Sequence, residues 1–231
     1  MNQPLVSIVV TTKNEEKNIG NCLESISLQT YKAIETIVVD NNSTDQTKEI
    51  ARRYTEKVYN RGPERSAQRN YGMIEKADGT YVMFVDADMT LSPNLIERAT
   101  HFMEADTGVS ALYISEIILG KKYFSKVRRF ERGFYDGTVI DGARFFRKNI
   151  FVQVGGFDET MSGPEDWDLD KKIKQIGRIA LLPNQHDSVI YHNEAEFDLK
   201  KYLSKKGYYS KSLDRYAEKW GRNNPDIRRQ L

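Results

Sequence analysis

Two aspartates separated by one small residue are the first candidates for chemistry. Asp86 and Asp88 follow the apolar and aromatic run Tyr81-Val-Met-Phe-Val85. Such a run predicts a strand buried on both faces, and ligands of open α/β sheets bind at the carboxyl ends of these strands. Side chains two apart in an extended chain point to the same side, so both carboxylates could face one Mg²⁺ or Mn²⁺ ion that holds a diphosphate. For an isolated pair, the favoured alternative is a strand that ends in an aspartate turn.

Polar residues also follow the first two predicted strands. The first strand runs into the turn Thr11-Thr-Lys13-Asn-Glu15, and the second ends at Asp40. The carboxyl ends of parallel strands meet at one edge of a doubly wound sheet, so we expect these side chains near Asp86. Asp40 is placed to accept hydrogen bonds from a base or a sugar. A turn or helix-capping aspartate is an equally supported alternative.

Three arginines lie between the second strand and the strand that ends at Asp86. Arg61, Arg65 and Arg69 bring positive charge to this region. A helix that starts near Ser66 would present its N-terminus to a phosphate group. Ordinary surface arginines are the alternative, and it is favoured for Arg61 and Arg65.

A distant acidic element follows a glycine and a proline. Glu165, Asp166 and Asp168 come directly after Gly163-Pro164. A carboxylate in this loop could act as general base towards an incoming hydroxyl. Acids in a first helical turn also stabilise the helix dipole, which is the alternative for Glu165 and Asp168.

Two other side chains have both a binding and a structural interpretation. Trp167 could stack on a sugar face, or it could pack in the core or a loop. His192 follows Val-Ile-Tyr at an expected strand end. A lone histidine there is more often structural than a ligand.

The elements that must position these residues alternate between strand and helix over the first hundred residues. This alternation predicts a mostly parallel α/β sheet with helices on both faces. The second half is mixed, and we expect one domain over residues 1–195 and a basic, aromatic helical extension over residues 196–231. The expected strands are residues 5–11, 35–40, 57–59, 81–86, 109–115, 143–147 and 179–182. The helices begin near residues 19, 47, 66, 95, 123 and 164, and a last helix carries Tyr209, Leu213, Tyr216, Ala217 and Trp220 on one face.

Composition is that of an ordinary globular protein. The chain has 231 residues, of which 39% are hydrophobic and 29% charged, enough for one substantial core. We find neither a signal peptide nor an apolar run of the roughly 18 residues that a membrane span needs. Cys22 is the one cysteine, which is compatible with a reducing compartment. We therefore expect a cytoplasmic protein, with peripheral attachment to the cytoplasmic face of the membrane as an option.

Charge is unevenly distributed although the net charge is only +2. Residues 121–132 hold six basic residues and one acidic, and residues 198–231 hold ten basic and four acidic. Both segments also contain aromatic residues, so an anionic membrane surface is a candidate partner. The alternatives are solvated helix faces, packing on the domain and contact with a homodimer partner. Nucleic acid is disfavoured, because the basic segments lie away from the acidic sheet edge and contain no recognised module.

Six motifs in this order resemble the family 2 glycosyltransferases of the GT-A fold. The resemblance covers roughly residues 5–192 and implies a Rossmann-like GT-A domain that uses a nucleotide-diphospho sugar. Each motif alone is weak evidence, and the order of all six makes the resemblance specific. The motifs are the threonine-rich end of the first strand, Val38-Val-Asp40-Asn-Asn-Ser-Thr-Asp45, Arg69-Asn70-x-Gly72, Asp86-Ala-Asp88, Val154-Gly-Gly-Phe-Asp158 and Glu165-Asp166.

The resemblance implies a role for each matching position. The donor side would comprise Thr11, Lys13, Glu15 and Asp40 at the nucleoside, Arg69 near the diphosphate and Asp86 at the ribose or sugar. Asp88 would bind Mn²⁺ or Mg²⁺, and His192 falls where several family members place a histidine near the metal or diphosphate. Asp166 would be the general base, with Glu165 in support. A single displacement with a base and no enzyme nucleophile inverts the anomeric centre.

The resemblance also narrows the reaction. The Gln-x-x-Arg-Trp motif and membrane spans of processive synthases are absent from the sequence, which favours transfer of a single hexose to a hydroxyl or phosphate of a glycan or lipid-linked acceptor. UDP is the donor nucleotide that the family uses most. One alternative is a sugar nucleotidyltransferase, although the Thr11–Glu15 turn lacks the glycines typical of that class. Another is a non-catalytic module that binds nucleotide sugars or glycans, although such a module would need no base.

Overall fold

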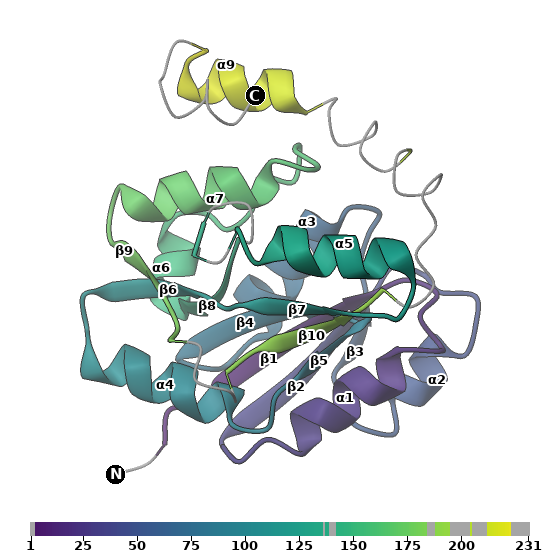
Figure 1. Ribbon diagram of the computed structural model, residues 1–231. Coiled ribbons are helices and arrows are strands. Elements are labelled where there is room, and N and C mark those ends of the chain that lie inside the picture. The colour runs from purple at the N-terminus through teal and green to yellow at the C-terminus, as the bar shows by residue number, and fades with distance from the viewer. Residues whose placement is uncertain are drawn as a thin grey trace.

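A mostly parallel sheet forms the centre of the computed structural model (Figure 1). The structure describes residues 3–135, 137, 138, 142–183, 188–194, 204 and 212–222. Within these ranges the main sheet has seven strands in the order β3-β2-β1-β4-β8-β6-β9. Their bounds are β1 Val6–Thr12, β2 Ile34–Asp40, β3 Val58–Asn60, β4 Tyr81–Asp86, β6 Val109–Tyr113, β8 Ala143–Arg147 and β9 Arg178–Leu181.

Most neighbouring strands of this sheet run in the same direction. Strand β1 pairs in parallel with both β2 and β4, and its Thr11 is level with Asp86. Strand β8 runs antiparallel to β4 and to β6. The expected strand positions are confirmed to within about two residues. The α/β class with a mostly parallel sheet is therefore confirmed.

Helices cover both faces of the sheet because the strand side chains are apolar on both faces. Val6, Ile8 and Val10 of β1 point into one core cluster, which also receives α1 and α4. Val9 points into the other, which receives the π-helical turn, α6 and α7. The helices are α1 Ile19–Ser27, α2 Thr47–Ala51, α3 Arg65–Asn70, the π-helical turn η1 Tyr71–Lys76, α4 Leu95–Ala105, α5 Tyr123–Arg132, α6 Lys148–Gln153, α7 Glu165–Lys174 and α9 Leu213–Trp220.

A second, small sheet was not predicted from the sequence. It joins β5 (Met89–Leu91), β10 (Ile190–Asn193) and β7 (Glu116–Leu119) in the order β5-β10-β7. Strand β10 lies antiparallel to β5, with His192 opposite Met89. The pairing therefore brings His192 beside Asp88, which is more than a hundred residues away in sequence.

The expected C-terminal extension is described only in part. Helix α9 lies within it. Residues 195–203, 205–211 and 223–231 lie outside the described residues, and they include Tyr209 and the expected boundary at residue 195. None of the helices that the structure describes is long and apolar enough to cross a membrane.

Candidate active site

A cavity of about 510 Å³ lies at the carboxyl ends of β1 and β4. It brings together six of the side chains predicted from the sequence, together with Arg65. The six are Thr11, Lys13, Glu15, Asp86, Asp88 and His192. The remaining lining residues are Thr12, Asn41, Pro63, Glu64, Gln68, Ala87 and Ser162.

Asp88 and His192 form a pair at the edge of this cavity. Asp88 Oδ2 lies 3.2 Å from His192 Nε2, and Asn193 N donates to the Asp88 carbonyl at 2.9 Å. The second carboxylate oxygen, Oδ1, is buried and accepts no hydrogen bond within the described part of the chain. A buried carboxylate oxygen without a donor is costly, so this atom suits a cation.

These two side chains fit a small divalent cation only in combination with a substrate. No group of three or more His, Cys, Asp or Glu side chains gathers at metal-binding distances among the residues that the structure describes. Mg²⁺-type ions commonly take one or two protein ligands and complete their coordination with water and substrate phosphates. The donor set at Asp88 and His192 matches that pattern.

The protonation of His192 bears on this fit. Burial alone would lower the pKa of His192, but Asp88 and Glu116 raise it to about 10. The imidazole is therefore protonated at neutral pH in the absence of a cation. A protonated imidazole cannot act as a ligand, so metal binding at His192 would release a proton.

Asp86 has different neighbours from Asp88. Its Oδ1 accepts from Thr11 Oγ1 at 3.1 Å and lies 3.4 Å from Arg69 Nη2, and its Oδ2 lies 3.9 Å from Arg144 Nη1. Burial alone would raise the pKa of Asp86, but Arg69 and Arg144 hold it well below its ordinary value. The two aspartates therefore do not share their surroundings, because β4 ends at Asp86 and Asp88 lies in the turn that follows.

Arg69 connects the donor-side aspartate with the expected base. Its guanidinium carbon lies 3.9 Å from the centre of the Phe84 ring, and its side chain is 2% exposed. Nη1 lies 3.4 Å from Asp166 Oδ1, and Nη2 lies at the same distance from Asp86. Arg69 thus holds near one another two carboxylates that are 80 residues apart in the sequence. Its contact with a diphosphate stays a prediction.

Asp166 and Glu165 both lie in the first turn of α7, but only the side chain of Asp166 is partly exposed, at 28%. Glu165 is buried, pairs with Arg65 Nη2 at 3.1 Å and accepts from Gly163 N. Burial raises the pKa of Asp166 to about 6; Glu165 adds to the rise, and Arg69 opposes it. A carboxylate with a pKa near neutrality suits a general base.

Two buried charged residues of this site were missed by the sequence analysis. Glu116 on β7 accepts from Arg144 Nε at 2.6 Å, pairs with Arg132 and lies 3.7 Å from His192 Nδ1. Arg144 in turn reaches Asp86. The available signal was Arg144 itself, a charged residue inside the otherwise apolar run Ala143–Phe146.

Asp40 lies outside the cavity lining, and its side chain is committed to its own turn. Its carboxylate is buried and accepts from Ser43 N at 2.7 Å and from Ser43 Oγ at 2.5 Å. This is the turn interpretation that the sequence left open. Contact with a nucleoside base stays a prediction.

Trp167 is likewise outside the cavity lining. It packs edge-on against Tyr216 of α9, with ring centres 5.8 Å apart. Trp220 Nε1 of the same helix donates to Asp168 Oδ1 at 2.9 Å, and Lys219 Nζ lies 2.8 Å from that oxygen. The described part of the C-terminal segment therefore packs on the domain. The aromatic face of α9, which we expected to meet a membrane, packs against α7 instead, and Tyr216 on that face is fully buried.

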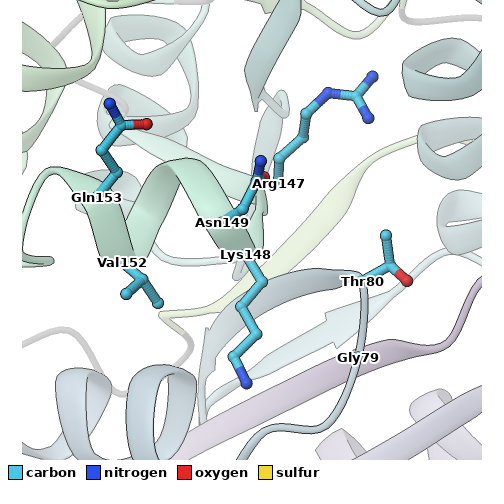
Figure 2. Close-up of a pocket in the computed structure, with 7 residues that line it drawn as sticks. All are labelled: Gly79, Thr80, Arg147, Lys148, Asn149, Val152 and Gln153. Carbon is cyan, nitrogen blue, oxygen red and sulfur yellow. The ribbon is translucent and has the colours of Figure 1, made fainter.

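A larger hollow lies away from these residues. Figure 2 shows its lining, which comes from the loop before β4, the end of β8 and α6, and its volume is about 700 Å³. Its cationic side chains are engaged elsewhere: Arg147 donates to Val109 O at 2.8 Å, and Lys148 donates to Ala77 O. It contains none of the predicted site residues.

Comparisons with known proteins show which family the chain matches. The family model described as "Glycosyl transferase family 2" matches residues 7–157. The chain is 28% identical over 193 residues to an uncharacterised glycosyltransferase of Rickettsia typhi, covering 76% of this chain and 60% of that protein. It is 28% identical over 242 residues to the glycosyltransferase GlyA of Streptococcus pneumoniae, covering 93% of this chain and 32% of that protein. The chain therefore spans less than two thirds of the length of these relatives.

Solved structures show the same fold. The mannosyltransferase PcManGT of Pyrobaculum calidifontis, in complex with GDP-Man and Mn²⁺, matches with a TM-score of 0.70 at 21% identity, covering 94% of this chain and 64% of that one. S. aureus TarS in complex with UDP-GlcNAc matches with a TM-score of 0.67 at 22% identity, covering 84% and 60%. The expected GT-A fold is thereby confirmed.

Proposed function

Because the chain belongs to glycosyltransferase family 2, we propose that it transfers a single sugar from a nucleotide-diphospho sugar to a hydroxyl or phosphate of an acceptor. The observation that carries this proposal is the position of Arg69. It holds Asp86, at the donor cavity, and Asp166, with its raised pKa, within 3.4 Å of one guanidinium group. A donor-side acid and a base candidate are therefore brought together by one arginine.

The donor would occupy the cavity of about 510 Å³. Thr11, Lys13 and Glu15 would contact the nucleoside, and Arg65 supplies positive charge at the same wall. Asp88 and His192 would hold Mn²⁺ or Mg²⁺. Such an ion, when bound, neutralises charge on the leaving nucleotide diphosphate. UDP is the proposed nucleotide; solved structures of this fold carry UDP-GlcNAc in one case and GDP-Man in another.

Asp166 would accept the proton of the attacking oxygen. Its side chain is 28% exposed, so an acceptor can reach it, and burial keeps its pKa near that of an effective base. One displacement without an enzyme nucleophile inverts the configuration at the sugar. Glu165 would keep α7 in place through Arg65 and Gly163.

The acceptor would be a glycan or a lipid-linked molecule, and we place the reaction in the cytoplasm, where an unpaired cysteine such as the buried Cys22 persists. Residues 1–195 would form the transferase domain, with the remainder as an appendage. A non-catalytic binding module has less support, because such a module would not need the raised pKa of Asp166.

The test separates binding from chemistry. Asp166→Asn should lower transfer by about 10²–10⁴-fold, because the general base is lost, and should leave donor binding within a few-fold of the wild type. Asp78→Asn is the matched control; its carboxylate is 74% exposed and lies outside the site, so this variant should retain transfer. Equal transfer by the wild type and Asp166→Asn would refute the assignment of the base.

A further inference from the structure

Helix α5 turns its polar face towards the protein and exposes its apolar face, which is the reverse of an ordinary surface helix. With about 100° between successive residues, Tyr123, Val127 and Phe130 fall on one side and Ser125, Arg128 and Arg132 on the opposite side. Contacts show that the polar side faces the protein. The apolar side faces outward, where Tyr123 is 74% and Phe130 73% exposed. Figure 1 shows α5 beside β7.

Polar bonds fix the inner face of α5 to the strands of the site. Ser125 Oγ donates to Glu194 O at 3.0 Å, and Arg128 pairs with the Glu194 side chain at 2.6 Å. Arg129 Nε donates to Ile118 O at 2.6 Å, and Arg132 pairs with Glu116. Glu116 also pairs with Arg144 of β8, and the neighbouring β10 carries His192. The orientation of α5 is therefore set by the strands that form the candidate active site.

The outer face is apolar along its whole length. Phe124 and Val127 are each more than two fifths exposed, and Phe134, just beyond the helix, is 67% exposed. Phe130 and Phe134 contact each other edge to face, with ring centres 5.1 Å apart. On ordinary surfaces exposed apolar residues are scattered singly, whereas a continuous exposed apolar patch of this kind marks a docking surface.

Positive charge flanks the patch. Lys121 and Lys122 directly precede α5, and Lys126 lies in its N-terminal half. All three are exposed, and no ion pair joins any of them to an acid within the described residues. An aromatic face with flanking lysines matches a surface that is apolar inside and anionic at its rim.

We infer that the outer face of α5 inserts into the headgroup region of an anionic lipid bilayer, with the three lysines on the lipid phosphates. The consequence for catalysis rests on the proposed function: the sugar acceptor is then carried by a lipid and reaches the site from the bilayer surface. Helix α9, whose aromatic residues are packed against α7, has no part in this contact.

The test is co-sedimentation of the full chain with vesicles, which needs neither donor nor acceptor. Vesicles of phosphatidylcholine with one quarter phosphatidylglycerol are compared with pure phosphatidylcholine, at low and at high salt. The apolar variant is Tyr123→Ser/Phe130→Ser, and the charge variant replaces Lys121, Lys122 and Lys126 with glutamine. Leu28→Ser is the matched control, because Leu28 is 67% exposed at the end of α1, away from the patch.

We expect the wild type to bind the anionic vesicles at low salt and to bind them less at high salt. Binding should fall at least ten-fold in the apolar variant and should also fall in the charge variant, whereas Leu28→Ser should bind like the wild type. All substituted residues are exposed, so the variants should fold as the wild type does; an unchanged melting temperature checks this. Absence of binding at low salt would overturn the inference, as would equal binding by the apolar variant. A dimer in sedimentation velocity that Phe130→Ser dissociates, without vesicle binding, would assign the face to a second copy instead. A protein that transfers sugar but ignores vesicles would leave the proposed function standing and remove only this inference.

Discussion

Replacing Glu116 with glutamine should destabilise the fold by about 3–5 kcal/mol, the usual cost of removing one partner from a buried ion pair. The Glu116 side chain is fully buried and is shared by Arg144, which is 7% exposed, and Arg132, which is 17% exposed. Glutamine keeps the shape but removes the buried negative charge that Arg144 and Arg132 share. At about 2–4 °C per kcal/mol for a chain of this size, the melting temperature should fall by roughly 6–20 °C.

Urea unfolding at pH 7 measures this change, with a matched exposed pair as control. Asp106 and Arg178 lie 2.5 Å apart with side chains 48% and 55% exposed. Exposed pairs contribute about 1 kcal/mol or less, so Asp106→Asn should have a small effect. If Glu116→Gln cost no more than Asp106→Asn, the central role of the buried pair would be refuted.

The same variant has a defined pH dependence. Burial alone would raise the pKa of Glu116, but Arg144, His192 and Arg132 hold it well below its ordinary value of 4.5. A carboxylate with a lowered folded-state pKa contributes stability that is present above the unfolded value and is lost as the pH falls through the folded value. The stability difference between wild type and Glu116→Gln should therefore be full near pH 6 and shrink below pH 4.5. It should also decline as the pH rises above 6.5, because Glu116 helps to raise the pKa of His192.

Two further predictions follow from the site and from the packing of the sheet. Transfer should fall about ten-fold per pH unit below pH 6, because burial and Glu165 raise the pKa of Asp166 to about 6 and the base must be ionised; a pH–rate profile that is flat from pH 5 to 7.5 would contradict this. Gly72→Ala should lower the free energy of unfolding by about 1–3 kcal/mol in urea, because the added Cβ would collide with Val9. Gly20→Ala should raise it by up to about 1 kcal/mol, because the added Cβ has its nearest neighbour at 3.7 Å and alanine favours the helix. Changes of the same sign in both variants would contradict the packing around η1.

Local patterns were enough to predict the main sheet. Apolar runs such as Tyr81–Val85 and the helical spacing of Ile19, Cys22, Leu23 and Ile26 are properties of neighbouring residues. Both appear in the structure at the expected positions. The cavity edge followed from the same reasoning, because parallel strands place Thr11 level with Asp86.

The small sheet could not be predicted in the same way. Met89–Leu91 has three residues, too few for a periodic signal, and its partner β10 lies about a hundred residues further on. The expectation that Asp86 and Asp88 face one cation assumed an extended chain, but the chain turns after Asp86. The direction of the aromatic face of α9 also depends on a non-local partner, the surface of α7. Helical periodicity predicts a face but does not say what covers it.

The most direct test of the proposed donor site is a thermal-shift series with UDP, GDP, dTDP and ADP, with and without Mn²⁺, on the wild type and Asp88→Ala. At 100 times its dissociation constant a ligand stabilises by about 2.7 kcal/mol, which is roughly 5–10 °C here. We predict a Mn²⁺-dependent rise with one nucleotide, UDP, which is absent in Asp88→Ala and preserved in Asp78→Ala, a control with a 74% exposed carboxylate. A series in which no nucleotide raises the melting temperature with Mn²⁺, or in which Asp88→Ala keeps the full rise, would contradict the assignment of this cavity to a nucleotide-sugar donor.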